Sequence, residues 1–431
     1  MQSNNADLYT GWRLVLAGLQ MLFVAFGSLV LVPLITGLDP SVALFTAGIG
    51  TLIFQLTTKR SVPVFLASSF AFIAPIIFSV QTWGMAATMG ALFCAGLVYV
   101  LLAVLVALRG PGFLHRLLPP VVTGPIIMII GLGLAPIAVN MAMGKTGDAS
   151  AVLFPYSDAM WVSMPALITT LLVATLAKGI FRLVPILAGV TVGYAIAAFM
   201  GMVDLTAVNN AEWLRFPGFV TPEFNIAAIL FMIPVAIAPA IEHVGDVLAI
   251  GSVTGKDYVQ KPGLHRTLLG DGLATSAASL FGGPPNTTYS EVTGAVMLTK
   301  AFNPVVMTWA AVFAILLAFV AKFGTLLQTI PTPVMGGILI LLFGSIAGVG
   351  MNILIKGKVD MSAQRNLVIV ATTLVFGIGG MAIGSEAWHL QGVSLCGVVA
   401  IAMNLILPHP DPVTDLHEEQ EIVEDIVEHG R

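Results

Sequence analysis

The stretch GGPPNTTYSEVTG, at residues 282–294, and the stretch VPVFLASSFAF, at residues 62–72, each interrupt a long apolar run. A chain without regular structure leaves backbone N–H and C=O groups unpaired, and at membrane depth only surrounding protein or a cavity can satisfy them. Interrupted segments at matching positions of two halves are the best sequence indication of a transporter's binding site. The simpler alternative is that Pro63 and the pair Pro284–Pro285 merely kink two ordinary helices.

The composition places most of the chain in lipid. Of 431 residues, 57% are hydrophobic and 9% are charged, against about a quarter charged in ordinary soluble domains. These values exclude a soluble enzyme and a disordered chain, and no charge run is typical of a nucleic-acid-binding surface. The N-terminus lacks the basic start of a signal peptide, so we expect the first apolar run to remain as a membrane helix. The tail after Pro410 is acidic and lacks a core of its own.

A helix needs about 20 apolar residues to cross the hydrocarbon core. By that measure the sequence predicts fourteen spans, of which the third and the tenth are the interrupted ones. The spans lie near residues 13–36, 41–57, 64–80, 84–107, 119–143, 159–177, 183–202, 226–250, 264–281, 284–300, 303–325, 333–355, 364–384 and 388–407.

Lysine and arginine residues orient these spans, because short basic loops face the cytoplasm. The loops after odd-numbered spans contain only Lys145, Arg215 and Lys322. We therefore predict a multi-pass protein of the inner (plasma) membrane with both termini in the cytoplasm. The basic residues after even-numbered spans are Lys59, Arg60, Arg109, Arg116, Lys178, Arg182, Lys256, Lys261, Arg266, Lys300, Lys356, Lys358 and Arg365.

Fourteen spans divide into two sets of seven, and an odd number in each set inverts the second half relative to the first. The interrupted spans are the third of each half. Residue offsets agree roughly, because Gln20 and Glu242 are 222 positions apart and Ser69 and Ser290 are 221 apart. The sequence thus predicts an all-α membrane protein built from two inverted repeats of seven segments.

Three carboxylates are the main candidates inside predicted spans, where ionisable groups mark functional sites by default. Glu242 and Asp246 lie four residues apart in the eighth span and share a helix face. Glu291 lies in the interrupted tenth span. No lysine or arginine falls in the central part of any span, so structural ion pairing is the weaker reading. We expect at least one carboxylate to be protonated part of the time, which favours proton coupling and requires no metal or other cofactor.

Further polar residues are weaker candidates. Gln20, in the first span, could face the site or form a hydrogen bond across helices. His243 points about 100° away from Glu242 around the helix, and a buried histidine is more often a packing residue than a relay. Asp271, at the start of the ninth span, is either a helix-end group or a gating group.

Five motifs resemble the nucleobase–ascorbate transporter family, and within it the bacterial uracil permeases. The resemblance covers nearly the whole chain between the termini. The motifs are SSFAFIAP at 68–75, IEHVGD at 241–246, GLHRTLLGDG at 263–272, PNTTYSEVTGAVMLTK at 285–300 and IPTPVMGGILILLFG at 330–344.

The resemblance implies a fold of fourteen segments with short strands in segments 3 and 10, between which the base binds. It implies a homodimer in the lipid membrane, built through the gate domain. The implied parts are residues 1–12 as cytoplasmic N-terminus, 13–107 and 226–325 as core domain, 119–202 and 333–407 as gate and dimerisation domain, and 408–431 as acidic cytoplasmic tail.

The resemblance also assigns the substrate contacts. Glu242 and Glu291 would accept hydrogen bonds from the base, and the backbone amides of Phe70 and Ser290 would donate to its carbonyls. Tyr289 would line the site. Chemistry supports this set, because uracil offers N–H donors and C=O acceptors that match carboxylates and free amides. Candidates for proton coupling are Glu242, Asp246 and Glu291, and the weaker site candidates are Gln20, Ser69 and His243.

Four positions depart from the uracil-permease pattern. Met21 and Asp246 replace histidines, and Ser290 replaces a glycine. Val292 stands where the family signature has asparagine, whereas Gly294, Thr299 and Lys300 follow the signature. Valine cannot make the hydrogen bonds of asparagine, so these departures bear mainly on the identity of the substrate.

The function expected from these observations is proton-coupled uptake of uracil or a closely related base by alternating access. A purine permease for xanthine or urate is the alternative, although a glutamate at 291 favours a pyrimidine. An anion transporter of the related sulfate-permease type is disfavoured because carboxylates repel anions. An enzyme would need a metal cluster or a nucleophile–base pair that the seven histidines do not indicate, and a channel fits paired interrupted helices less well.

Overall fold

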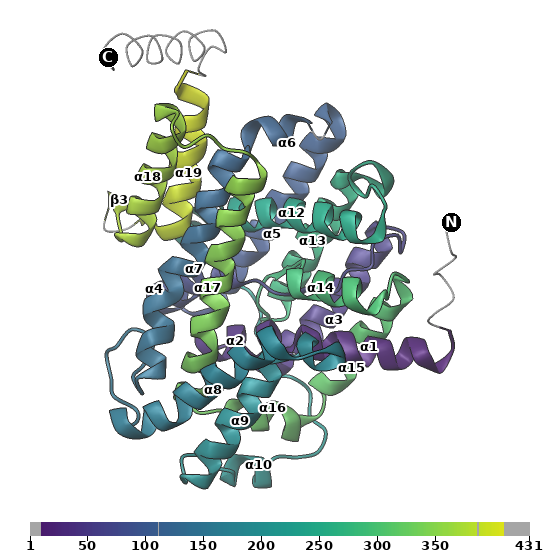
Figure 1. Ribbon diagram of the computed structural model, residues 1–431, viewed down its shortest axis with the longest axis vertical. Helices are drawn as coiled ribbons and strands as arrows, with labels where there is room; N and C mark the ends of the chain where they lie inside the picture. Colours follow the sequence, from purple (N-terminus) through teal and green to yellow (C-terminus); the bar gives the residue numbers. More distant parts are fainter. Residues whose placement is uncertain (1–9, 111, 386–387, 409–431) are drawn as a thin grey trace, which may run out of the picture.

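A computed structural model describes residues 10–110, 112–385 and 388–408 (Figure 1). The acidic tail beyond Pro408 and the first nine residues lie outside the described residues. Helices dominate the first half of the chain. Its elements are α1 (Trp12–Val24), α2 (Phe26–Thr36), α3 (Pro40–Thr57), β1 (Ala67–Ser68), the 3₁₀ helix η2 (Phe70–Phe72), α4 (Ile73–Trp83), α5 (Met85–Arg109), α6 (Gly112–Leu117), α7 (Pro120–Ala142), α8 (Tyr156–Leu176), the 3₁₀ helix η3 (Gly179–Leu183), α9 (Pro185–Phe199) and α10 (Thr206–Asn210).

The second half is also mainly helical and adds a hairpin near its end. Its elements are α11 (Ile226–Met232), the 3₁₀ helix η4 (Pro234–Ala236), α12 (Ile237–Thr254), the π-helical turn η5 (Val259–Gly263), α13 (Leu264–Leu280), β2 (Asn286–Thr287), α14 (Ser290–Thr299), α15 (Val305–Ala318), α16 (Ala321–Gln328), α17 (Thr332–Lys356), α18 (Gln364–Ile378), β3 (Ala382–Ser385), β4 (Trp388–Gln391) and α19 (Gly392–Ile406).

The described helices are those of a multi-pass membrane protein. Seven helical stretches are long and apolar enough to cross a membrane, and five shorter ones of 10–17 residues are also apolar. Each of the fourteen predicted ranges contains a helix. The seven long stretches are Trp12–Thr36, Pro40–Thr57, Met85–Arg109, Pro120–Ala142, Tyr156–Leu176, Ile226–Thr254 and Thr332–Lys356.

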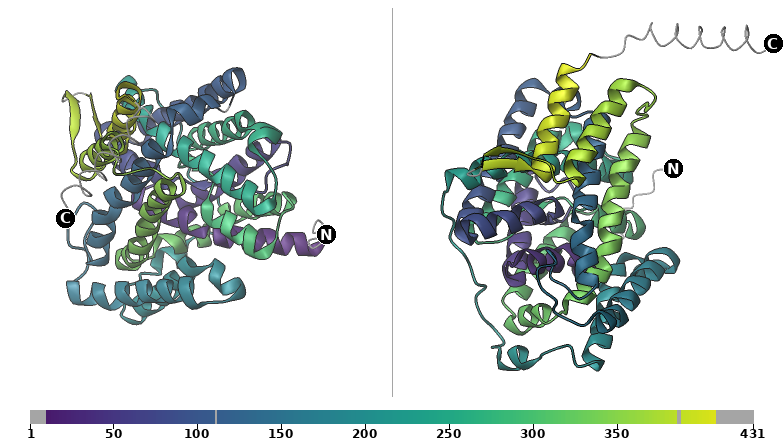
Figure 2. Two further views of the ribbon diagram at one scale, coloured as in Figure 1. Left: turned by 45° about the horizontal axis from the view of Figure 1, so that its top comes forward. Right: turned by 90° about the vertical axis from the view of Figure 1, so that its left-hand side faces the viewer.

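The predicted end of the thirteenth span and the predicted start of the fourteenth span were wrong. The sequence predicted helix over 364–384 and 388–407, but α18 ends at Ile378 and α19 begins at Gly392. Strands β3 and β4 form an antiparallel hairpin between them, visible at the edge of the molecule beside α19 (Figure 2). Gly380 has a φ of +70°, a left-handed conformation that glycine adopts readily, which ends the helical path.

Two sets of helices carry most of the packing. In one set α7 packs along α17 in the middle of the molecule (Figure 1), and α8, α9, α18 and α19 pack around that pair. In the other set α13 packs against α3 and α5, α15 packs against α3 and α1, and α11 packs against α5. Contacts between the two sets are sparser and include those of α12 with α7 and α19.

The contacts are reciprocal between the two halves of the chain. Helix α3 packs on α15 in the way that α13 packs on α5, and α8 packs on α9 as α18 packs on α19. Likewise α17 contacts α8, and α7 contacts α18. Exchanging first-half helices for their second-half counterparts therefore reproduces the main helix contacts.

Candidate functional site

The two interrupted segments meet as a pair of short strands. Strand β1 pairs with β2 in antiparallel register, with Ala67 opposite Thr287 and Ser68 opposite Asn286. The N–H of Ser69 extends the pairing by donating to the carbonyl of Pro285 at 2.9 Å. The strands expected in these segments are present, so the proline-kinked helices of the alternative reading are excluded.

Hydrogen bonds with neighbouring helices hold the two strand segments in place, and they pair part of the polar backbone that non-helical chain exposes inside a membrane protein. The Thr51 hydroxyl of α3 accepts from the N–H of Leu66 at 2.9 Å. The Thr275 hydroxyl of α13 donates to the carbonyl of Asn286 at 2.7 Å, and the Asn286 amide donates to the carbonyl of Thr46 at 2.8 Å. The crossing of β1 and β2 is thus fixed between α3 and α13.

Each strand is followed at once by a helix start. Phe70 begins η2, which continues into α4, and Ser290 begins α14. The first N–H groups of a helix have no carbonyl partner within it, and their dipoles give that end a partial positive charge. The site therefore combines two helix N-termini that can donate hydrogen bonds to an acceptor.

Helix α12 supplies two carboxylates to the same place. Glu242 is half-buried and Asp246, one turn later on the same face, is buried. The Ser290 hydroxyl donates to Asp246 Oδ1 at 2.5 Å, which joins α12 to the start of α14. Glu291, the next residue of α14, is exposed to the cavity between these elements.

A cavity of about 590 Å³ unites these groups, and its size is typical of small-molecule sites. Six predicted site residues line it. They are Phe70, Glu242, Asp246, Tyr289, Ser290 and Glu291. The ring centroids of Phe70 and Tyr289 lie 6.3 Å apart, so two aromatic side chains form part of the wall.

The three weaker candidates lie elsewhere. Gln20 of α1 is half-buried and is not part of the cavity wall. Ser69 is buried, and its backbone serves the strand pairing. His243 faces away from the cavity, as the helix geometry predicted, and its ring packs edge-on to Phe54.

Asp271 joins His243 behind the site. His243 Nδ1 lies 3.3 Å from Asp271 Oδ2, and both side chains are fully buried. The Thr287 hydroxyl donates to the same oxygen at 3.3 Å. Asp271 of α13 thus contacts both α12 and β2, the elements next to the carboxylate cavity, and does not line the cavity itself.

Sequence reasoning missed the opposite wall of the cavity. Helix α17 contributes Ser345, Asn352 and Lys356, and α7 contributes Pro120 and Ile127. The available signal was the spacing of polar residues in α17, where positions 345, 352 and 356 recur on one face of an otherwise apolar helix.

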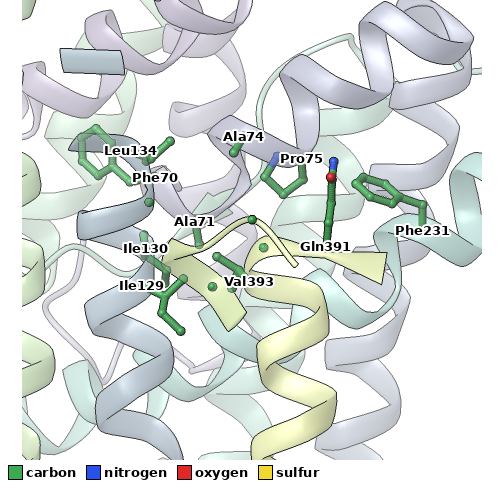
Figure 3. Close-up of a pocket in the computed structure, with 14 residues that line it drawn as sticks. Phe70, Ala71, Ala74, Pro75, Ile129, Ile130, Leu134, Phe231, Gln391 and Val393 are labelled. Atoms are coloured by element: carbon green, nitrogen blue, oxygen red, sulfur yellow. The ribbon is translucent and has the colours of Figure 1, made fainter. Parts of the chain in front are cut away.

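A second cavity, of about 290 Å³, lies on the other side of Phe70 (Figure 3). Phe70 lines both cavities and therefore separates them. Ile129, Ile130 and Leu134 of α7 form one wall of the second cavity, and Gln391 and Val393 lie at the hairpin side. Among the described residues no carboxylate lines this cavity, whereas three line the larger one, so the polar chemistry described here belongs to the larger cavity.

Comparisons with known proteins agree with this architecture. Residues 13–385 match the model of the Permease family, Xan_ur_permease. A probable uracil permease of Pasteurella multocida is 61% identical over 391 residues, covering 91% of this chain and 93% of that protein. A uracil permease of Bacillus caldolyticus is 45% identical, with 96% of this chain and 97% of that protein covered.

The fold is also similar to that of a solved structure of distant sequence. The transmembrane domain of the cyanobacterial bicarbonate transporter BicA superposes with a TM-score of 0.64 at 14% identity, covering 91% of this chain and 96% of that one. The relatives that share both sequence and length are permeases and not enzymes. The chain therefore belongs to the permease family of nucleobase–ascorbate transporters.

Proposed function

We propose that this protein takes up uracil, or a closely related base, together with a proton by alternating access across the inner membrane, with both termini in the cytoplasm. The observation that carries the proposal is the cavity in which Glu242, Asp246 and Glu291 face the start of α14. The names of the 61% and 45% identical relatives support uracil as the cargo.

The cavity offers the donors and acceptors that a uracil ring needs. Glu242 and Glu291 accept hydrogen bonds from the ring N–H groups, and the N–H groups of Phe70 and Ser290 donate to its carbonyl oxygens. The rings of Phe70 and Tyr289 provide apolar contact for the flat base. A neutral base suits this site because its donors compensate the carboxylates without adding charge.

The charges of the cavity support proton coupling. Three carboxylates line it, and Lys356, the one basic side chain in its wall among the described residues, lies at the far end of α17. An unpaired buried charge is strongly disfavoured in a low dielectric. A proton shared among Glu242, Asp246 and Glu291 reduces that charge and allows the loaded site to move between the two sides.

The two helix sets are the proposed moving parts. The set containing α3, α5, α13 and α15 corresponds to the core, at 13–107 and 226–325, and the set around α7 and α17 to the gate, at 119–202 and 333–407. The reciprocal helix contacts support fourteen segments in two inverted repeats. The cavity lies between the sets, and we propose a homodimer formed through the gate set.

Val292 gives no reason to replace uracil by another base. Val292 is 1% exposed and packs inside the protein rather than in the cavity wall. Its departure from the family signature therefore changes no direct contact with the base. The resemblance to a bicarbonate transporter rests on fold alone, and three carboxylates in the cavity disfavour an anionic cargo.

Uptake of radiolabelled uracil into proteoliposomes tests the proposal. With an outside pH about one unit lower, one proton per base supports at most about tenfold accumulation. We expect accumulation that a protonophore abolishes, and competition by pyrimidines but not by xanthine or urate. Uptake that ignores the pH gradient would contradict proton coupling, and preferential competition by purines would change the assigned cargo.

A further inference from the structure

Helix α17 carries three of its four polar side chains on one face. Its four polar residues are Thr332, Ser345, Asn352 and Lys356, and the last three line the carboxylate cavity. An apolar residue at any of these three positions would also form a helix, and polar residues inside a membrane span are energetically costly. Their common orientation indicates a polar path along the α17 wall.

The path leads from the carboxylates to the end of the cavity. At 1.5 Å per residue, Asn352 lies about 10 Å along α17 from Ser345, and Lys356 lies about 6 Å further. On the facing helix α12, Ser252 lines the same cavity about 9 Å beyond Asp246. The Ser345 end of α17 is at the candidate base site, because the rings of Phe343 and Phe70 lie 6.4 Å apart, so Asn352 lies between that site and the end marked by Lys356.

Asn352 is the residue of this path with the chemistry to bind a base. Its side chain is exposed to the cavity and makes no hydrogen bond among the described residues. Ser345, in contrast, donates its hydroxyl to the carbonyl of Leu342 at 2.7 Å. A carboxamide presents both a donor and an acceptor, which matches the adjacent C=O and N–H groups of a pyrimidine edge.

We propose that Asn352 forms a release subsite on the α17 wall, which holds the base by its C=O and N–H edge after it leaves the carboxylates. This inference rests on the proposed function, since it assumes a base as cargo. Ionised carboxylates only accept hydrogen bonds, whereas Asn352 also donates, so the base exchanges one set of contacts for another as it moves along the cavity.

Asn352→Leu tests the subsite, because it keeps the size of the side chain and removes the amide. Loss of one hydrogen bond predicts a rise of about five- to tenfold in the half-saturating uracil concentration on the side to which Asn352 opens. From the opposite side the value stays within about twofold. Met351→Leu is the matched control, since Met351 is exposed but is not in the cavity wall, and it leaves both values unchanged. If Asn352→Leu changes the half-saturating uracil concentration equally from both sides, or leaves it unchanged on both, the subsite is contradicted.

A second measurement does not depend on transport. The Asn352→Cys variant, with Cys94 and Cys396 replaced by alanine, reacts with a water-soluble maleimide, and a panel of pyrimidines and purines is tested for protection. Protection by a base supports the subsite, and an unreactive or unprotected cysteine overturns it. Failure of the proposed function is distinct, because it is the absence of uracil uptake by the wild-type protein.

Discussion

At the scale of single residues, the cavity contains three carboxylates and one distant ammonium group. Asp246 is held by Ser290 at 2.5 Å, whereas Glu242 and Glu291 face the cavity with no ion pair to a basic side chain among the described residues. Lys356 is more than two helical turns beyond Ser345 on the opposite wall, so it does not neutralise them directly. In the proposed function, a base and a proton complete this arrangement.

Glu242→Gln removes an ionisable acceptor and keeps the size of the side chain. A hydrogen bond to a charged group contributes about 1.5–3 kcal/mol, so we expect initial uracil uptake to fall by more than about tenfold. Gradient-driven accumulation is lost completely. Glu223→Gln, at an exposed position before α11, is the control and keeps wild-type uptake. A Glu242→Gln protein that still accumulates base against a gradient would remove this residue from the mechanism.

The acidic residues were predictable because a carboxylate within an apolar run is rare and costly. Asn352 was not predicted, because a single amide in an apolar helix also fits packing between helices. Only the placement of α17 against α12 shows that its amide lines the cavity. The orientation of His243, in contrast, was predictable from the sequence, because adjacent residues of a helix point about 100° apart.

At the scale of elements, close helix approach depends on small residues. A Cβ added at Gly131 of α7 would collide with the carbonyl oxygen of Phe343 in α17, and one added at Gly350 would meet the carbonyl oxygen of Gly124. Small residues allow backbones to approach in this way inside membranes. The close approach of α7 and α17, which form one wall of the cavity, therefore depends on glycine at these positions.

Gly131→Ala is expected to destabilise the protein by about 1–3 kcal/mol, the usual effect of overpacking. Gly133→Ala is the matched control in the same helix, because the nearest atom to an added Cβ there is 4.0 Å away. The comparison uses the thermal unfolding midpoint of each purified variant, monitored by size-exclusion chromatography after heating. Equal midpoints would show that the α7–α17 contact tolerates a methyl group.

Some elements were predictable from the sequence and others were not. The two interrupted segments were predictable because each combines proline with consecutive polar residues inside an apolar run, whereas a lone proline, such as Pro125 in α7, leaves a helix continuous. The β3–β4 hairpin was missed because 382–391 lies between two apolar runs, and hydropathy does not distinguish a short strand from a helix end. The break between α1 and α2 at Ala25 was not predicted, because no proline or glycine occupies that position.

At the scale of the whole molecule, the cavity wall is shared between two helix sets with sparse mutual contacts. Relative motion of two such bodies is the usual expectation when the interface between them is small. Leu248 of α12 and Ile353 of α17 line the same two neighbouring cavities from opposite sets. They are therefore suitable positions to test whether the sets move during transport.

Cross-linking the variant Leu248→Cys/Ile353→Cys with a short bifunctional thiol reagent is expected to stop transport, and a reductant that cleaves the reagent restores it. Both native cysteines are replaced first. The control pair is Gln55→Cys/Thr308→Cys, two positions of one set whose native side chains are hydrogen-bonded at 2.5 Å. That cross-link leaves transport intact. Undiminished transport by the cross-linked Leu248–Ile353 pair would contradict motion between the sets.

The central claim is that the carboxylate cavity carries a base and a proton together. Proton movement into proteoliposomes, recorded with an internal pH-sensitive dye when uracil is added outside without any imposed gradient, tests it most directly. We predict internal acidification that begins with uracil addition, saturates with uracil concentration and is absent in Glu242→Gln. Uracil entry without acidification, at equal rates in the wild type and Glu242→Gln, would contradict the account.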